Sequence, residues 1–359
     1  MLLTKAATAV SLGLGNIMRV ADYRLRLRVG IHPVQRIPEV ITPRAPFFDA
    51  CTTASSRETP ERLEPIGAYF GWLAPAVGGP PDWHHNVLTG SHSKLVDEVW
   101  WRIPDFDFAV GDVKGIWAAS RFDWAVTLAQ RAALHDDASL AQLNAWVEDW
   151  CAKNPPYRGH NWKCGQEASI RVMHLAVASL VLGQTKSPRL SLVELLELHL
   201  ERIAPTIRYA MAQNNNHGTS EAAALFIGGS WLAAVGRPRG HEWELVGRSM
   251  LANRAVRLID ADGSFSQYSV NYHRLMLDTL SVAEVWRRQQ DLPPLADIVY
   301  ERATAATEWL RVMVDPTNGD APNLGANDGT NLLPLTDCGI RDHRPTVHLA
   351  ATLFQRRSA

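Results

Sequence analysis

The stretch GQEASIRVMHLAVASLVLG at residues 165–183 decides the fold class of this chain. Apolar residues recur in it three to four positions apart, as at Ile170, Met173 and Val177, which is the spacing of one helical face. The same spacing predicts helices over residues 117–134, 140–152, 165–183, 189–212, 219–235, 241–260, 271–290, 295–314 and 342–356. Short connections marked by Gly or Pro predict antiparallel hairpins of consecutive helices, and hence a mainly α, (α/α) array.

The chain divides into two predicted parts. Residues 1–45 are expected to form a helical segment and then an extended, proline-rich one. Residues 46–359 are expected to form one (α/α) domain with long loops at 72–115 and 315–341. The first loop is aromatic and the second is rich in Gly, Asn and Asp. Loops of this length in a compact domain are usually functional or disordered.

Composition excludes several classes of protein. Of 359 residues, 46% are hydrophobic and 20% are charged, which is typical of a globular chain. A formal net charge of -1 provides no general basic field for nucleic acid.

No run approaches the ~20 apolar residues of a membrane span. Residues 6–18 are apolar, but arginines follow them where a signal peptide has its cleavage site. We therefore expect a soluble protein, cytoplasmic or periplasmic.

The motifs of several common enzyme classes are also missing. The cysteines are scattered without a C-x-x-C pair, and His84-His85 lacks a third metal ligand. The chain has no G-x-S-x-G, Walker A or H-E-x-x-H motif. We therefore expect neither a metal nor a cofactor.

The segment Asn214-Asn215-Asn216-His217 lies where an apolar helical run begins. Free backbone N–H groups and the helix dipole favour an anionic ligand at such a place. Asn supplies neutral donors and His a donor whose charge can be tuned. The alternative is an Asx turn and helix cap, with His217 bonded within the protein. The residues alone leave both interpretations open.

A second segment, residues 262–274, begins with an Asp-Gly turn and continues into a helix. Tyr272, His273 and Arg274 bring together a phenol, an imidazole and a guanidinium. Tyr268 precedes Tyr272 by four positions and shares its face if the helix covers both. A phenolate is a competent base for a carbon acid once cations lower its pKa. The alternative, favoured on these residues alone, is an interface tyrosine bonded to a neighbouring hairpin.

Two further segments carry polar side chains. Residues 161–171 include Trp162, which offers a flat face to a sugar ring, together with Gln166, Glu167 and Arg171. The alternative there is a buried Glu167–Arg171 pair at i,i+4. Residues 322–329, PNLGANDG, suit a tight loop, but acidic ligands are too few for an EF-hand calcium loop.

Five stretches in order across roughly residues 95–330 resemble the heparinase II/III-like polysaccharide lyases and their alginate-lyase relatives. The stretches are WRIPDFDFAVGDVKGIWAASRFDW, NPPYRGHNWKCGQEASIRVMH, NNNHGTSEAAALFIGG, DGSFSQYSVNYHRLMLD and PNLGANDG. The resemblance implies an (α/α) toroid followed by a C-terminal β-sandwich, and cleavage of uronate glycans by β-elimination. It implies that Asn216 and His217 neutralise the uronate carboxylate and that Tyr272 is the catalytic tyrosine. The candidate substrate-binding residues are then Gln166, Glu167, Arg171, Asn215, Gln267, Tyr268, His273, Arg274 and Trp162.

We expect the sequence to depart from this family by lacking the β-sandwich. We expect either a truncated or split form or a separate β-sandwich chain that supplies the second wall of the cleft. The predicted function is eliminative cleavage of an acidic polysaccharide, by the chain alone or as the toroid half of a lyase. One alternative is a non-catalytic glycan-binding or polysaccharide-biosynthesis accessory protein. A less favoured one is a glycoside hydrolase, which needs two carboxylates across one cleft. The carboxylates considered for it are Glu167, Glu221, Asp262 and Asp328.

Overall fold

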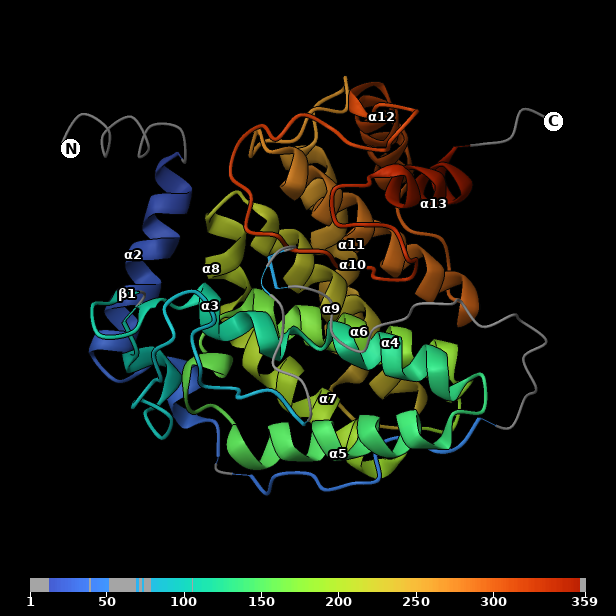
Figure 1. The fold of residues 1–359 in the computed structure, drawn as a ribbon. Helices are drawn as coiled ribbons and strands as arrows, with labels where there is room; N and C mark the ends of the chain where they lie inside the picture. Colours follow the sequence, from blue (N-terminus) through green and yellow to red (C-terminus); the bar gives the residue numbers. More distant parts are fainter. Residues whose placement is uncertain are drawn as a thin grey trace.

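The computed structural model describes residues 13–38, 40–51, 69–70, 73, 79–104 and 106–355 (Figure 1). Its α-helices are α2 (Leu14–Arg28), α3 (Lys114–Trp117), α4 (Asp123–Ala132), α5 (Asp137–Lys153), α6 (Gly165–Val181), α7 (Leu190–Ile203), α8 (Ile207–Ala212), α9 (Asn216–Ala234), α10 (Gly240–Leu258), α11 (Val270–Gln289), α12 (Asp297–Met313) and α13 (Arg344–Phe354). Short 3-10 helices are η1 (Pro33–Arg36), η2 (Trp100–Arg102), η3 (Ala118–Arg121), η4 (His160–Trp162) and η5 (Ala204–Thr206). Strands β1 (Phe106–Asp107) and β2 (Gly111–Asp112) pair antiparallel, with Phe106 opposite Asp112.

The long helices form two layers of hairpins (Figure 1). In one layer α4, α6, α9, α11 and α13 contact one another in that order, and α5, α7, α10 and α12 pack against them from the other layer. Helices α6 and α9 are buried on nearly every side, which explains why α9 reads AAALFIGG without a polar face. The mainly α prediction of (α/α) hairpins is confirmed.

Helices α9 and α10 pack with their backbones in close approach. A Cβ atom on Gly247 of α10 would lie 2.3 Å from the backbone nitrogen of Phe226 in α9. Since real Cβ contacts do not come this close, only glycine fits there. This contact fixes the outer helix against α9, whose first turn carries the Asn-His segment.

The predicted helix bounds need correction at two places. The helix predicted over 117–134 is interrupted because Phe122 adopts a left-handed conformation with φ 68°, and α4 begins at the next residue. The helix predicted over 189–212 divides into α7 and α8 at Pro205, because proline has no N–H to continue the helical hydrogen bonds.

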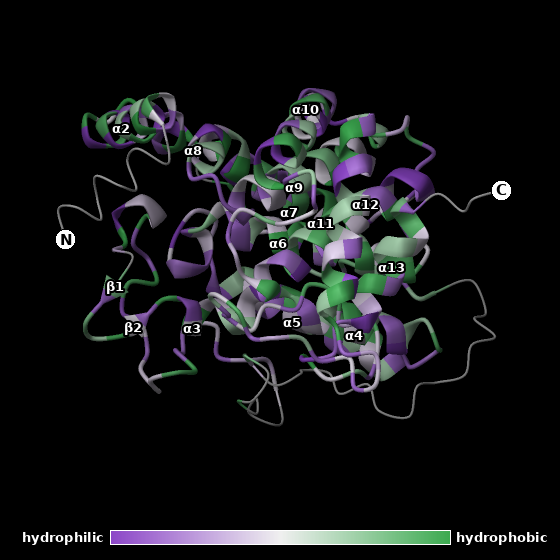
Figure 2. Ribbon diagram, turned by 90° about the horizontal axis from the view of Figure 1, so that it is seen from above, coloured by the Kyte–Doolittle hydropathy of each residue, from purple (hydrophilic) through white to green (hydrophobic). Residues whose placement is uncertain are grey.

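The N-terminal part and the long loops lie outside the helix array. Helix α2 lies outside it beside α8 (Figures 1 and 2). Residues 1–12 of the predicted N-terminal segment, and most of residues 52–78, lie outside the described residues. Strand pairing in the described part is limited to β1–β2 and isolated bridges, so no β-sandwich is found there. None of the described helices combines the length and apolar character needed to cross a bilayer.

Candidate active site

The first turn of α9 is held by the amide side chains that the sequence analysis selected. Asn215 caps the helix, since its side-chain oxygen accepts a hydrogen bond from the His217 N–H at 3.1 Å. The Asn216 N–H donates to Oε1 of Gln267 at 2.8 Å. This bond joins the start of α9 to the segment that leads into α11. The helix cap of the second interpretation is present, and the anionic ligand of the first stays a prediction.

The start of α11 is joined in turn to the loop at 322–330. Ser269 caps α11 by accepting from the Tyr272 N–H, and its hydroxyl donates to the Ala326 carbonyl. The Tyr272 hydroxyl donates to Oδ2 of Asp328 at 3.4 Å. Gly325 lies so close that a Cβ would meet the Tyr268 carbonyl at 2.2 Å, and its φ of +73° also requires glycine. The loop thus places a carboxylate beside the phenol.

Arg121 connects that carboxylate to a second one. Its guanidinium donates to both carboxylate oxygens of Glu167, at 2.8 and 2.9 Å, and to the Thr330 hydroxyl at 2.7 Å. The shortest distance from Arg121 Nη2 to Asp328 is 3.9 Å. These side chains are 4–12% exposed, so the pairing is largely shielded from water. We call Arg121, Glu167 and Asp328 the charge network.

Sequence reasoning missed Arg121 altogether. The residue lies within one of the quoted stretches, but nothing in its local spacing distinguishes it from the other arginines. Its partners Glu167 and Thr330 come from distant parts of the chain, so only the folded arrangement identifies it.

The carboxylates of the charge network act electrostatically on both the imidazole of His217 and the phenol of Tyr272. Burial lowers the pKa of His217, while the carboxylates of Glu221, Glu167 and Asp328 oppose that shift. Burial and then Asp328 raise the pKa of Tyr272 to about 12. The expectation that cations lower the pKa of Tyr272 is therefore corrected, because burial and the charge of Asp328 together outweigh Arg121. At neutral pH the imidazole is neutral and the phenol keeps its proton.

Glu221 follows His217 by four residues, one turn further along α9. It is 3% exposed, and its Oε2 has no hydrogen-bond partner among the described residues. The carboxylate faces the start of α6, where a Cβ on Gly165 would lie 2.4 Å from Oε1. The Cys164 sulfur lies 3.9 Å from Nδ1 of His217. Burial raises the pKa of Glu221 to about 8.

The buried carboxyl of Glu221 predicts a pH-dependent stability. The folded-state pKa of about 8 lies above the ordinary 4.5, so the folded protein holds this proton more tightly than the unfolded chain. The stability that the bound proton gives to the folded state is complete below about pH 4.5 and is lost as the pH rises through about 8. We expect the stability of Glu221→Gln relative to the native chain to rise by about 3–4 kcal/mol between about pH 5 and pH 8, measured by denaturant unfolding.

Glu301→Gln, at an exposed position of α12, is the matched control for this measurement. It should keep the pH dependence of the native chain. The same pH dependence in Glu221→Gln as in the native chain would contradict the buried, protonated carboxyl.

Several predicted binding residues lie elsewhere, and their roles are corrected here. Trp162 is 1% exposed and its indole N–H donates to the Asn154 carbonyl, so it offers no face to a sugar. Arg171 is also fully buried, bonded to His199 and Asn161 and not to Glu167. The His273 ring stacks on Trp309 and bonds to the Ala306 carbonyl, on the side of α11 that faces α12.

The remaining predicted residues surround the network in different ways. Arg274 is 3% exposed and bonds to Asn271 and the Thr330 carbonyl, so it supports the loop that carries Asp328. Tyr268 is 81% exposed and precedes α11, which begins at Val270, so it does not share a helical face with Tyr272. Gln166 is buried in the first turn of α6, next to Glu167.

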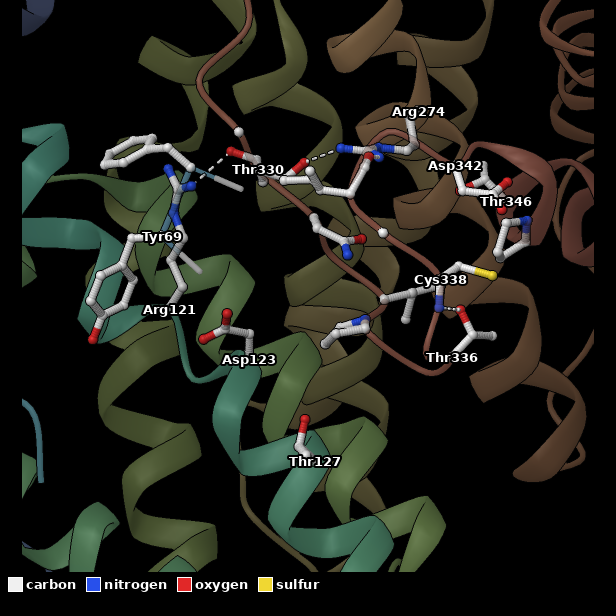
Figure 3. Close-up of a pocket in the computed structure, with 18 of the residues that line it drawn as sticks. Tyr69, Arg121, Asp123, Thr127, Arg274, Thr330, Thr336, Cys338, Asp342 and Thr346 are labelled. Atoms are coloured by element: carbon white, nitrogen blue, oxygen red, sulfur yellow. Dashed lines mark hydrogen bonds between the residues drawn. The ribbon is translucent and has the colours of Figure 1, made fainter. Parts of the chain in front are cut away.

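A cavity of about 360 Å³ adjoins the charge network on one side (Figure 3). Its lining includes Tyr69, Arg121, Asp123, Arg274 and Thr330. Figure 3 shows Arg121 reaching Thr330 from one side and Arg274 reaching it from the other. Arg121 is the member of the charge network that lines this cavity, whereas Glu167 and Asp328 are not among its lining residues.

Comparison with known proteins places this arrangement in a family. A family model described as the heparinase II/III N-terminus matches residues 93–312. The chain belongs to this family. The match covers the starts of α6, α9 and α11, and with them Glu167, Asn216, His217 and Tyr272. The predicted family is confirmed, and four of the five stretches that suggested it lie within the matched residues.

Two solved structures resemble this member of the heparinase II/III family. One, described as the crystal structure of heparinase III, has 15% identity and a TM-score of 0.49, with 88% of this chain and 48% of that chain covered. The other, a heparinase III gene product with methylated lysines, has 14% identity and a TM-score of 0.40, with 64% and 41% covered. The chain thus spans less than half the length of either structure. No curated protein matches it. The comparisons give no support to a separate β-sandwich chain.

Proposed function

We propose that this chain acts on an acidic, uronate-containing polysaccharide by β-elimination, with Asn216, His217 and Tyr272 at the reacting sugar. One observation carries the proposal: the first turns of α9 and α11 meet at one charge network. The Asn216–Gln267 hydrogen bond joins the two starts, the Tyr272 hydroxyl bonds to Asp328, and the charges of Glu167 and Asp328 act on both His217 and Tyr272. Membership of the heparinase II/III family supports a polysaccharide as the substrate.

The chemistry explains why these residue types are needed. Elimination breaks the C5–H bond, forms a double bond between C4 and C5, and expels the glycosidic oxygen from C4. The C5 proton is weakly acidic because the developing charge must spread onto a carboxylate that is already negative. Hydrogen-bond donors fixed around that carboxylate lower the barrier. The amide of Asn216 and the imidazole of His217 are suited to this role.

Tyr272 is assigned the proton transfer. Because its pKa is raised to about 12, it carries a proton at neutral pH and can donate it to the departing glycosidic oxygen. The C5 proton passes either to the Tyr272 phenolate or to the neutral imidazole of His217. The pH profile separates the two: the phenolate gives turnover that rises towards about pH 12, and the imidazole gives a plateau by neutral pH.

The experiment is to incubate the protein with heparin, heparan sulfate, alginate and polygalacturonate. We expect at least one polymer to yield the ultraviolet absorbance of an unsaturated uronate. New reducing ends without that absorbance would indicate a hydrolase and overturn the proposal. Binding with no cleavage of any polymer would favour the non-catalytic alternative.

A further inference from the structure

A second cavity, of about 1000 Å³, lies between α2, α8 and the C-terminal half of α10. Helix α2 lies beside α8 (Figures 1 and 2), and residues of both helices line this cavity. The rings of Tyr23 and Tyr209 stack at 4.2 Å between the centroids, which fixes α2 to α8. We call this cavity the α2 pocket. It lies outside the candidate active site and has a lining of its own.

Arginine dominates the lining of the α2 pocket. The arginines are Arg19, Arg26, Arg208, Arg254 and Arg257. Among the lining residues Asp22 is the one carboxylate, and it already pairs with Arg26 at 2.8 Å. No ion pair to an acidic residue is found for the other arginines in the part of the chain that the structure describes. The pocket therefore carries positive charge that the protein does not neutralise.

Mutual repulsion is evident at Arg254. Burial, followed by the charges of Arg257 and Arg19, lowers the pKa of this guanidinium to about 10. A chain with a net charge of -1 has no overall excess of positive charge, so this concentration is local. An anion bound in the pocket would relieve the repulsion. Guanidinium groups pair with carboxylates and sulfates through two parallel hydrogen bonds.

The α2 pocket is connected to the candidate active site through one turn. Nη1 of Arg254 donates to the Met211 carbonyl at 3.0 Å and to the Asn214 side-chain oxygen at 3.3 Å. Asn214 precedes His217 by three residues, a separation of at most roughly 11 Å between Cα atoms. A polymer that occupies the site at His217 therefore has to travel only a short distance to reach the arginines.

We propose that the α2 pocket is an accessory subsite that binds an acidic unit of the same polysaccharide, away from the sugar that reacts. The inference rests on the proposed function for the identity of the polymer, but it makes a separate claim. The pocket contributes affinity for long acidic chains and takes no part in bond breaking. A pocket confined between three helices beside the candidate site favours a glycan over a nucleic acid, which is usually bound along an extended basic surface.

The test compares two double variants that remove the same charge. Arg208→Gln with Arg257→Gln changes two exposed pocket residues that have no ion pair among the described residues. Arg24→Gln with Arg28→Gln changes two exposed residues of α2 that do not line the pocket. Affinity is measured for short and long heparin oligosaccharides and for single-stranded DNA, and turnover is followed by the absorbance of the unsaturated uronate.

We expect the pocket variant to bind long heparin roughly tenfold more weakly and the control variant to bind as the native chain does. Turnover of short oligosaccharides should be the same in the pocket variant and in the control variant. A pocket variant that binds long heparin as tightly as the control overturns the subsite. Tighter binding of single-stranded DNA than of heparin overturns the choice of a glycan.

The failure of either proposal has its own signature. If no variant produces the unsaturated uronate but the pocket variant alone loses heparin affinity, the lyase proposal fails and the subsite stands. If turnover occurs and the two double variants bind alike, the lyase proposal stands and the subsite fails. If the native chain binds no heparin, alginate or polygalacturonate, the subsite is overturned.

Discussion

Replacing Tyr272 with phenylalanine is expected to lower turnover of an acidic polysaccharide by roughly 100- to 10,000-fold, the usual range for a lost general acid or base. The substitution removes one hydroxyl, whose described hydrogen bond is the long one to Asp328 at 3.4 Å. The ring remains packed against the core, so the fold should be preserved. The measurement is the initial rate of absorbance increase, together with a thermal unfolding curve.

Tyr268→Phe is the matched control for this prediction. It removes the same hydroxyl from a tyrosine four positions away that is 81% exposed. We expect its turnover to remain within about twofold of the native chain, because its ring points to solvent and not to the charge network. Equal turnover of Tyr272→Phe and Tyr268→Phe would remove Tyr272 from the proposed mechanism.

Replacing Arg171 with methionine is expected to destabilise the protein by about 3 kcal/mol. The change leaves the His199 ring nitrogen and the Asn161 carbonyl without their buried donor, and each such loss costs roughly 1–3 kcal/mol. It also removes the guanidinium that lies 4.8 Å from the Trp150 ring centroid. Relief of the buried charge offsets part of this cost.

Chemical denaturation measures this loss, with Arg24→Met at an exposed position of α2 as the control. The control should change stability by less than about 0.5 kcal/mol. A variant at Arg171 that unfolds like the native chain but binds substrate more weakly would restore Arg171 as a substrate contact.

The helices were predictable because each has its own local signature. The apolar spacing and the Gly or Pro at the ends are contained in each segment, so α6, α9 and α11 were located within a few residues. The exceptions are also local. The left-handed residue Phe122 has no side-chain signature of its own, and Pro205 divides a run whose apolar spacing continues across it.

The candidate site was predictable only in part, because its contacts join distant segments. The i,i+4 spacing suggested a pair between Glu167 and Arg171, but α6 is buried on many sides and offers each side chain several partners. Glu167 binds Arg121 from η3, and Arg171 reaches His199 in α7. The path of the loop at 315–341 has no periodic pattern, so its delivery of Asp328 to Tyr272 could not be foreseen.

The most direct test of the account is a crystal structure of Tyr272→Phe with an acidic uronate oligosaccharide bound. The account predicts a uronate carboxylate within hydrogen-bond distance of Asn216 and His217, with C5 of that sugar facing residue 272. An oligosaccharide bound elsewhere, with no sugar at Asn216 or His217, would contradict the central claim.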